Sequence, residues 1–433
     1  MKLNLLQLPQ YTVLLILVFG LIGCNVNNEI VDENKPDDTT YRISNDETKL
    51  SERLTDSDFD IVIVPVSPVA EKVDGQSISL QLIANIKTPV VDGVQTMATM
   101  ASVSKGSDRV TVSYSVRGAV YKGGIDFLEV AGGSAPVRGT RATPVRVRAS
   151  IEFTNAKANA VYVGDSHIFI AHSSDDPLLT QDEGYSAVQI FEHSGFTISS
   201  NSDQAGLPGF AANSIHALDN TVYVTSGSNA GLSSFNFEDK NLSKKNGYID
   251  IPEARWVDAN NERIVVLASN PASGIGSLYV LSVNEGTVLN KFTFEGADTP
   301  EAKNTVEIKG DLALIAAGRS GTHLIDLNTG ELIANIPIPD PSKLGLSPSV
   351  VESNAASADE EYIFIANGEA GVYVAVASKN LNEYVTGDPL TVELLGSLTF
   401  DELQSANHVS YRDQRLVVAA GLGGVKVVNL QKN

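Results

Sequence analysis

The chain has 433 residues, of which 42% are hydrophobic, and a formal net charge of −21. This length and apolar content can bury a large core, which excludes wholesale disorder. The acidic charge argues against nucleic acid as a partner, because phosphate contacts require a basic face. The single cysteine excludes a disulfide framework and any metal site built from several cysteines.

The first 24 residues have the features of a secretory signal. Lys2 precedes an apolar run from Thr12 to Gly23, which is too short for a membrane span of about 20 helical residues. The run ends in Leu21-Ile22-Gly23-Cys24, which resembles the lipobox of bacterial lipoproteins. The resemblance implies cleavage before Cys24 and acylation of this residue by fatty acids such as palmitate, which would anchor the chain to a membrane. The alternative is a buried cysteine at the end of an anchor helix.

Residues 24–58 are expected to form a flexible acidic tether. Asn, Asp, Glu, Thr and Ser dominate this stretch, so it cannot bury enough apolar surface to offset the entropy lost on ordering. We therefore assign residues 1–23 to a signal peptide, 24–58 to the tether and 59–433 to one folded domain.

A degenerate repeat runs through about residues 97–433. Each unit begins with Ala-Asn-x-apolar, followed by a polar turn, a short apolar run and a glycine turn. Intervals of 42 to 58 residues separate the units, which leaves room for three or four short strands in each. The pattern predicts an all-β, seven-bladed β-propeller. Its units are marked by Ala101, Asn159, Asn213, Arg255, Asn304, Asn354 and Asn407.

The last unit ends after its third strand, and the N-terminal part of the domain can supply the fourth. Residues 82–86 (LIANI) repeat the fourth strand of another unit at residues 332–336. A ring closed by a strand at about 78–88 has no open edge that could template aggregation. The apolar run Ile61–Val66 is then left over. It predicts either an additional outer strand or an eighth blade.

The repeats resemble the LVIVD-repeat propellers of bacterial secreted and lipid-anchored proteins. The resemblance rests on Val306–Asp311, Leu314–Ala316 and His323–Leu327, and it extends over about residues 78–433 without one complete copy. It implies the propeller fold and a binding role, and it carries no particular reaction. The Trp-Asp ending of WD-type repeats does not occur in the sequence.

The Asn series predicts a ring of amides around the axial channel of the propeller. Each member stands near the start of an innermost strand, so the series should share one level. The amides either bridge the backbones of adjacent blades or form a polar collar that holds an ion, water or a small polar ligand. Arg255 would add one positive charge. The candidate collar residues are Asn159, Asn213, Arg255, Asn304, Asn354 and Asn407.

Long connections between strands mark one face of the ring as the expected contact face. The first unit also carries an arginine-rich hairpin, which could meet an acidic partner, lipid headgroups or only solvent. Its arginines are Arg138, Arg141, Arg146 and Arg148. The candidate contacts on the loop face belong to the second unit and are His172, Asp175, Asp176, Asp182 and Glu183.

Motifs for catalysis or metal binding are missing from the sequence. The six histidines form no HxH or HExxH pattern, and no Gly-x-Ser-x-Gly elbow occurs. We expect no catalytic residue, no metal and no cofactor. The predicted function is a lipoprotein of the cell envelope, at the outer membrane, whose propeller is a non-catalytic binding or scaffold module for a protein or other ligand. The alternatives are a metal-assisted propeller enzyme of lactonase or lyase type and a subunit of an outer-membrane assembly complex.

Overall fold

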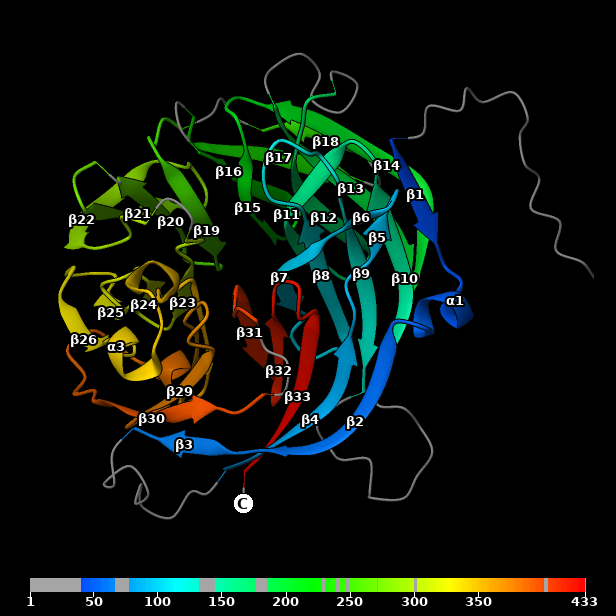
Figure 1. The fold of residues 1–433 in the computed structure, drawn as a ribbon. Coiled ribbons are helices and arrows are strands. Elements are labelled where there is room, and N and C mark those ends of the chain that lie inside the picture. Colours follow the sequence, from blue (N-terminus) through cyan, green and yellow to red (C-terminus); the bar gives the residue numbers. More distant parts are fainter. Residues whose placement is uncertain are drawn as a thin grey trace, which may run out of the picture. The chain divides into compact units, whose positions relative to one another are not determined.

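The computed structural model describes residues 40–66, 78–131, 145–176, 185–227, 230–238, 241–245, 249–270, 272–299, 302–400 and 404–432. These residues belong to the unit Thr40–Asn433, in which seven antiparallel sheets are arranged in a ring (Figure 1). The prediction of an all-β, seven-bladed propeller is therefore confirmed. The described residues contain no eighth blade.

Blades one to four each contain four consecutive strands, which follow one another from the channel outward. Blade one contains β7 (Met97–Val103), β8 (Arg109–Ser115), β9 (Gly123–Val130) and β10 (Val145–Phe153). Blade two contains β11 (Ala156–Val163), β12 (His167–Ser174), β13 (Ser186–Ser194) and β14 (Thr197–Leu207). Blade three contains β15 (Ala212–Leu218), β16 (Thr221–Ser226), β17 (Leu232–Glu238) and β18 (Asn241–Lys244). Blade four contains β19 (Ala254–Ala259), β20 (Arg263–Asn270), β21 (Ile275–Ser282) and β22 (Val288–Glu295).

The remaining blades follow the same order. Blade five contains β23 (Val306–Lys309), β24 (Leu312–Ala316), β25 (Thr322–Asp326) and β26 (Leu332–Ile336). Blade six contains β27 (Ala355–Asp359), β28 (Tyr362–Ala366), β29 (Val372–Ala377) and β30 (Val392–Leu398). Blade seven begins with β31 (His408–Arg412), β32 (Arg415–Ala419) and β33 (Val425–Lys432). Connecting segments hold helix α3 (Pro341–Leu344), the 3-10 turns Pro348–Val350 and Leu381–Glu383, and the β5 (Val90–Val91) and β6 (Val94–Gln95) pair.

The ring is closed by β4 (Ile78–Ile86), which pairs with β33 as the fourth strand of blade seven. The predicted closing strand is confirmed. The repeated sequence LIANI also takes the same register in both blades. In each blade, the first residue of the third strand pairs with the last Ile of LIANI. These pairs are Val425 with Ile86 in blade seven and Thr322 with Ile336 in blade five.

The segment before β4 lies along the outer edges of three blades. β1 (Tyr41–Ser44) pairs with β10 in blade one, β2 (Leu54–Ile61) with β4 in blade seven, and β3 (Ile63–Pro65) with β30 in blade six (Figure 1). The run at 61–66 therefore contributes to outer strands. This confirms the expectation of an additional outer strand, and not the alternative of an eighth blade.

The prediction of a flexible tether up to residue 58 is wrong for residues 40–58. This part forms β1, helix α1 (Glu47–Ser51), which Asp46 caps, and most of β2. Its few apolar side chains are spaced so that they reach the neighbouring blades. The Tyr41 ring centroid lies 5.1 Å from that of Phe191, and Leu50 is buried in the core. Residues 1–39, which include Cys24, lie outside the described residues.

The hydrophobic core lies between neighbouring sheets. Second strands of the blades contribute most, because residues of β12, β16, β24, β28 and β32 are buried throughout. These are the apolar runs that define the repeat in the sequence. Their burial on both faces explains why they are continuous rather than alternating with polar residues. The stacked sheets hold the innermost strands in a fixed ring, on which the candidate site is built.

Candidate functional site

Four asparagines of the predicted collar bridge adjacent blades. The Nδ2 atom of Asn159 donates to the carbonyl of Ala212 at 2.8 Å, and that of Asn213 donates to the carbonyl of Ala254 at 3.0 Å. The same bond repeats elsewhere in the ring. Its other members are Asn354 to Ala406 at 3.2 Å and Asn407 to Ala98 at 3.0 Å.

The bridging side chains sit on β-bulges in the blades where the innermost strand begins early. Pairing of β11 with β12 skips Asn159, and pairing of β15 with β16 skips Asn213. A bulge leaves the extra residue outside the ladder and redirects its side chain. The bulge therefore explains how one residue of a strand can turn toward the next blade.

In blade one, the predicted marker Ala101 lies two residues after the position that corresponds to the asparagines of other blades. The bulge in β7 falls at Thr99, and Asn407 reaches the carbonyl of Ala98. The hydroxyl of Thr99 donates to the carbonyl of Ala158 at 3.4 Å, so threonine makes the bridge that asparagine makes in other blades. The predicted register is wrong because the repeat motif assumes an amide side chain at the bulge.

Asn304 does not belong to the collar, and this prediction is wrong. Its side chain is fully buried, and its Nδ2 atom donates within its own loop to the carbonyls of Thr299 at 3.4 Å and Ala302 at 3.5 Å. Its backbone has a φ of 52°, in the left-handed region that asparagine tolerates better than most residues. The residue stabilises the turn before β23 instead of contacting blade six.

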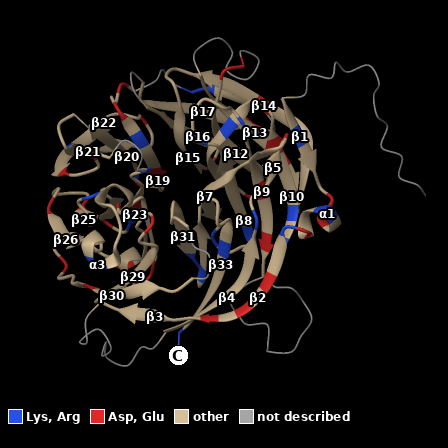
Figure 2. Cartoon of the chain, viewed as in Figure 1, with Lys and Arg blue, Asp and Glu red and all other residues tan. Residues whose placement is uncertain are grey.

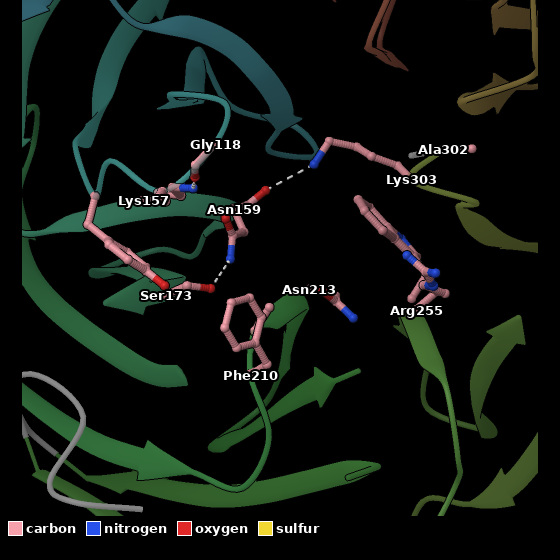
Figure 3. A pocket seen from close by; sticks show the side chains of 13 residues that line it. Gly118, Lys157, Asn159, Ser173, Phe210, Asn213, Arg255, Ala302 and Lys303 are labelled. Carbon is pink, nitrogen blue, oxygen red and sulfur yellow. Dashed lines mark hydrogen bonds between the residues drawn. The ribbon is translucent and has the colours of Figure 1, made fainter. Parts of the chain in front are cut away.

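A cavity of about 540 Å³ opens at the level of the collar, on the face of the long connections. Its walls come from blades one to five, and Asn159, Asn213 and Arg255 of the predicted collar contribute to them (Figure 3). The described residues that line it are Gly118, Ala119, Tyr121, Lys157, Asn159, Ser173, Phe210, Ala211, Asn213, Arg255, Trp256, Ala302 and Lys303.

Three cationic side chains line this cavity, and no carboxylate does so among the residues that the structure describes. The Nζ atom of Lys303 donates to the carbonyl of Asn159 at 3.1 Å, so it connects blade five to blade two across the opening (Figure 3). It also lies 6.0 Å from the centroid of the Trp256 ring. Lys157 donates to the carbonyl of Gly118 and lies 5.0 Å from the centroid of Tyr121. Burial lowers the pKa of Lys303 to about 8 and also lowers that of Lys157.

The Trp256 ring, which lines the cavity, stacks on a histidine across the channel. Trp256 of blade four and His408 of blade seven lie with ring centroids 5.5 Å apart and planes 26° apart. Burial lowers the pKa of His408 to about 3, with a further contribution from the charge of Lys303. The ring is therefore neutral, and its Nδ1 atom accepts a hydrogen bond from the backbone of Ala101 at 3.4 Å. Trp256 also lines a smaller cavity of about 110 Å³, which includes His216 and Asp258.

The structure places three of the predicted loop-face residues. His172 is wrong, because its side chain is fully buried and packs against Phe153 with ring centroids 5.8 Å apart. It stands on β12, where every residue is buried. Asp175 is exposed, whereas half-buried Asp176 accepts a hydrogen bond from Asn155 at 3.0 Å. Asp182 and Glu183 lie outside the described residues.

Two arginines of the basic hairpin pair within the protein. Arg148 lies 2.7 Å from Glu47 of α1, and Arg146 lies within 4 Å of Glu47 and of Glu129. Figure 2 shows basic positions on β10, next to α1. Helix α1, which the tether prediction did not include, supplies the partner. Arg138 and Arg141 lie outside the described residues.

Residue clusters of the kind that metalloenzymes use do not occur in the described part of the chain. It holds no group of three or more His, Cys, Asp or Glu side chains that could bind a metal ion. None of its helices has the length and apolar character needed to cross a membrane. The cavity at the collar gathers polar, cationic and aromatic side chains from five blades, and it is the candidate functional site.

Comparison with known proteins supports the fold alone. The chain matches no protein-family model and no curated protein sequence. Among solved structures, the WD40 repeats of RRP9 superpose with a TM-score of 0.53 at 11% identity, covering 80% of this chain and 98% of that one. The structure of U3-55K superposes with a TM-score of 0.51 at 11% identity, covering 79% and 98%. The chain is thus a β-propeller with WD40-like structural neighbours.

Proposed function

We propose that this protein is a bacterial lipoprotein, attached through Cys24 to the outer membrane, whose propeller is a non-catalytic binding module. The apolar run and the lipobox-like residues 21–24 support the anchor. The LVIVD-like repeats support the same class, because propellers with these repeats occur in secreted and lipid-anchored bacterial proteins. In this proposal, residues 25–39 connect the anchor to β1.

The cavity at the collar carries the binding role. Its volume of about 540 Å³ lies in the range of small-molecule and side-chain binding sites. A rigid ring of seven sheets holds its walls, so a ligand or a partner residue would meet a preformed surface. The polar lining consists of amides, hydroxyls and cations. These groups can bind and orient a ligand, whereas a metal-assisted lactonase needs several oxygen ligands that converge on the axis.

The anchor is tested with a Cys24→Ser variant in cells fed an alkyne-labelled palmitate. We expect labelled protein in the membrane fraction for the natural chain, and unlabelled protein outside that fraction for the variant. Equal labelling of both chains would refute the anchor.

The binding role is tested by crosslinking and affinity purification from intact cells. We expect the natural chain to recover a protein or ligand that is lost when Phe210, at the edge of the cavity, is replaced by Ala. Recovery of nothing, together with turnover of a small ester or sugar by the purified protein, would favour an enzyme instead.

A further inference from the structure

Two positions in the cavity depart from the repeat, and both departures introduce a positive charge. Arg255 occupies the bulge position that holds asparagine in blades two and three. Lys303 occupies the position just before the marker residue, where four other units have Ala158, Ala212, Ala254 and Ala406. The repeat pattern builds the ring, so departures from it that share one cavity point to a requirement other than folding.

The two departures come from adjacent blades and line the same cavity (Figure 3). The Lys303 ammonium contacts a carbonyl of Asn159 and the face of Trp256, and both groups are neutral. A desolvated cation with neutral partners is costly, and an anion placed beside it would recover the electrostatic energy.

The charges around the cavity favour a negatively charged ligand, although the chain as a whole is acidic. The net charge of −21 repels anions from most of the surface, yet the described lining of this cavity contains no Asp or Glu. Asp175 is an exposed acidic side chain near the rim, and burial together with the charge of Asp175 raises the pKa of the Tyr121 phenol. A confined cationic site in an acidic protein discriminates against neutral and cationic molecules.

Aromatic side chains supply the other half of the site. Trp256 lines the cavity, and Phe210 stands at the rim with 62% of its surface exposed. Phe210 packs against the exposed ring of Tyr185, with centroids 5.4 Å apart. A large exposed apolar ring on a soluble surface is typical of a contact site. The cavity thus offers aromatic surface as well as cationic side chains.

We infer that the cavity binds an organic anion, whose carboxylate or phosphate group is held by Arg255 and Lys303 and whose apolar part packs on Trp256 and Phe210. Guanidinium and ammonium donors together suit such a group, because arginine offers a planar fork and lysine a point charge. The anion is either a free small molecule or an acidic group presented by a partner. This inference rests on the proposed binding function and names its ligand class.

The test uses the single tryptophan of the chain, which lies in the site, as a fluorescent reporter. The purified protein is titrated with benzoate and phenyl phosphate, and with benzamide as a neutral molecule of the same shape. Calorimetry provides an independent measurement. We expect saturable binding of at least one anion, with an affinity about ten-fold or more above that of benzamide, because hydrogen bonds to charged groups are worth that much.

The repeat itself supplies variants that should fold. Arg255→Asn and Lys303→Ala restore the residues found at these positions in other units, and both should weaken anion binding about ten-fold or more while thermal stability is kept. Lys343→Gln, on exposed helix α3, removes one charge away from the cavity and should leave binding unchanged. Affinity for benzoate and for phenyl phosphate no higher than for benzamide, or no loss in Arg255→Asn and Lys303→Ala, would overturn the inference.

The source of the anion and the proposed function are separated by the same set of chains. Loss of the cellular partner in Arg255→Asn, but not in Lys343→Gln, indicates an acidic group on that partner. Retention of the partner together with loss of the benzoate response indicates a free anion. Failure of every anion to bind overturns the anion inference. The proposed binding function is then decided separately, by whether the Phe210→Ala variant loses the crosslinked partner.

Discussion

Arg53 and Asp126 form a buried ion pair that fastens the N-terminal segment to blade one. The two guanidinium nitrogens of Arg53 lie 2.9 and 2.6 Å from the two carboxylate oxygens of Asp126 on β9. Asp126 is fully buried and also accepts a hydrogen bond from the hydroxyl of Tyr114 at 2.6 Å. The pair joins the segment between α1 and β2 to a sheet that lies about seventy residues further along the chain.

Replacing Asp126 with Asn is expected to destabilise the protein by about 3–5 kcal/mol, because it leaves the charge of Arg53 without its counter-ion. The measurement is the free energy of unfolding in denaturant. Asp92→Asn is the control, because Asp92 pairs with Arg42 and Lys122 at the surface, and each such pair contributes about 0–1 kcal/mol. A similar loss of unfolding free energy in both variants would contradict a larger contribution from the buried pair.

Anion binding is expected to weaken as the pH rises past 8. The Lys303 ammonium binds an anion only while protonated, and burial has lowered its pKa from the ordinary 10.5 to about 8. Among the described residues, the charged and titratable groups of the cavity and beside Lys303 are Arg255, Lys157, Tyr121 and His408. The association constant for benzoate, measured from pH 6.5 to 9.5, should therefore fall above pH 8. In Lys303→Arg, whose guanidinium stays charged, it should remain nearly constant; a parallel fall in both chains would refute this assignment.

Acid is expected to destabilise the fold through His172. Burial lowers the pKa of this residue from 6.5 to about 4, and neither ring nitrogen has a hydrogen-bond partner among the described residues. The unfolded chain therefore takes up the proton first, and stability falls as the pH drops from 6.5 toward 4. The loss from this group is about 1.4 kcal/mol per pH unit. Thermal unfolding of His172→Phe should show a shallower decline over this range, and an unchanged slope would contradict the explanation.

Removing the amide of Asn407 is expected to weaken the seam between blades seven and one. Asn407→Ala leaves the carbonyl of Ala98 without this donor, which costs about 1–3 kcal/mol when the acceptor is shielded from water. Chemical unfolding measures the change. Asn382→Ala, which removes an exposed hydrogen bond to Asp359, is the control and should cost much less. Equal costs would mean that the seam does not depend on the amide.

The sequence predicted the ring well because each blade repeats one pattern. The LIANI pair located the closing strand, since identical pentapeptides in one repeat protein occupy equivalent strands. The outer segment at 40–58 was missed because Tyr41, Ile43 and Leu50 are isolated apolar residues in a polar stretch. Only the blades against which they pack make them structural. His172 was misplaced because its strand is buried on both faces, so alternation gives no sign of exposure.

The candidate site was predicted in part. Asn159, Asn213 and Arg255 were expected near the channel, and they line the cavity. Lys303, Trp256 and Phe210 were missed as site residues, because they come together only through the closure of blades one to five. A signal was present, however: lysine replaces the alanine of the repeat one blade after arginine replaces its asparagine. Two positively charged replacements in adjacent units would have identified the cationic part of the cavity.

The position of β1 and β2 on the outside of the ring has a mechanical consequence. A force applied through the chain before residue 40 acts first on β1, which pairs with β10 through four residues, from Tyr41 to Ser44. The contacts of α1 resist next, since Glu47 pairs with Arg148 and Leu50 is buried. The Arg53–Asp126 pair follows, before the load reaches β2. The closing strand β4 lies inside β2 and is loaded last. The segment can thus protect the ring from an applied force, because its short outer contacts break while the ring stays closed.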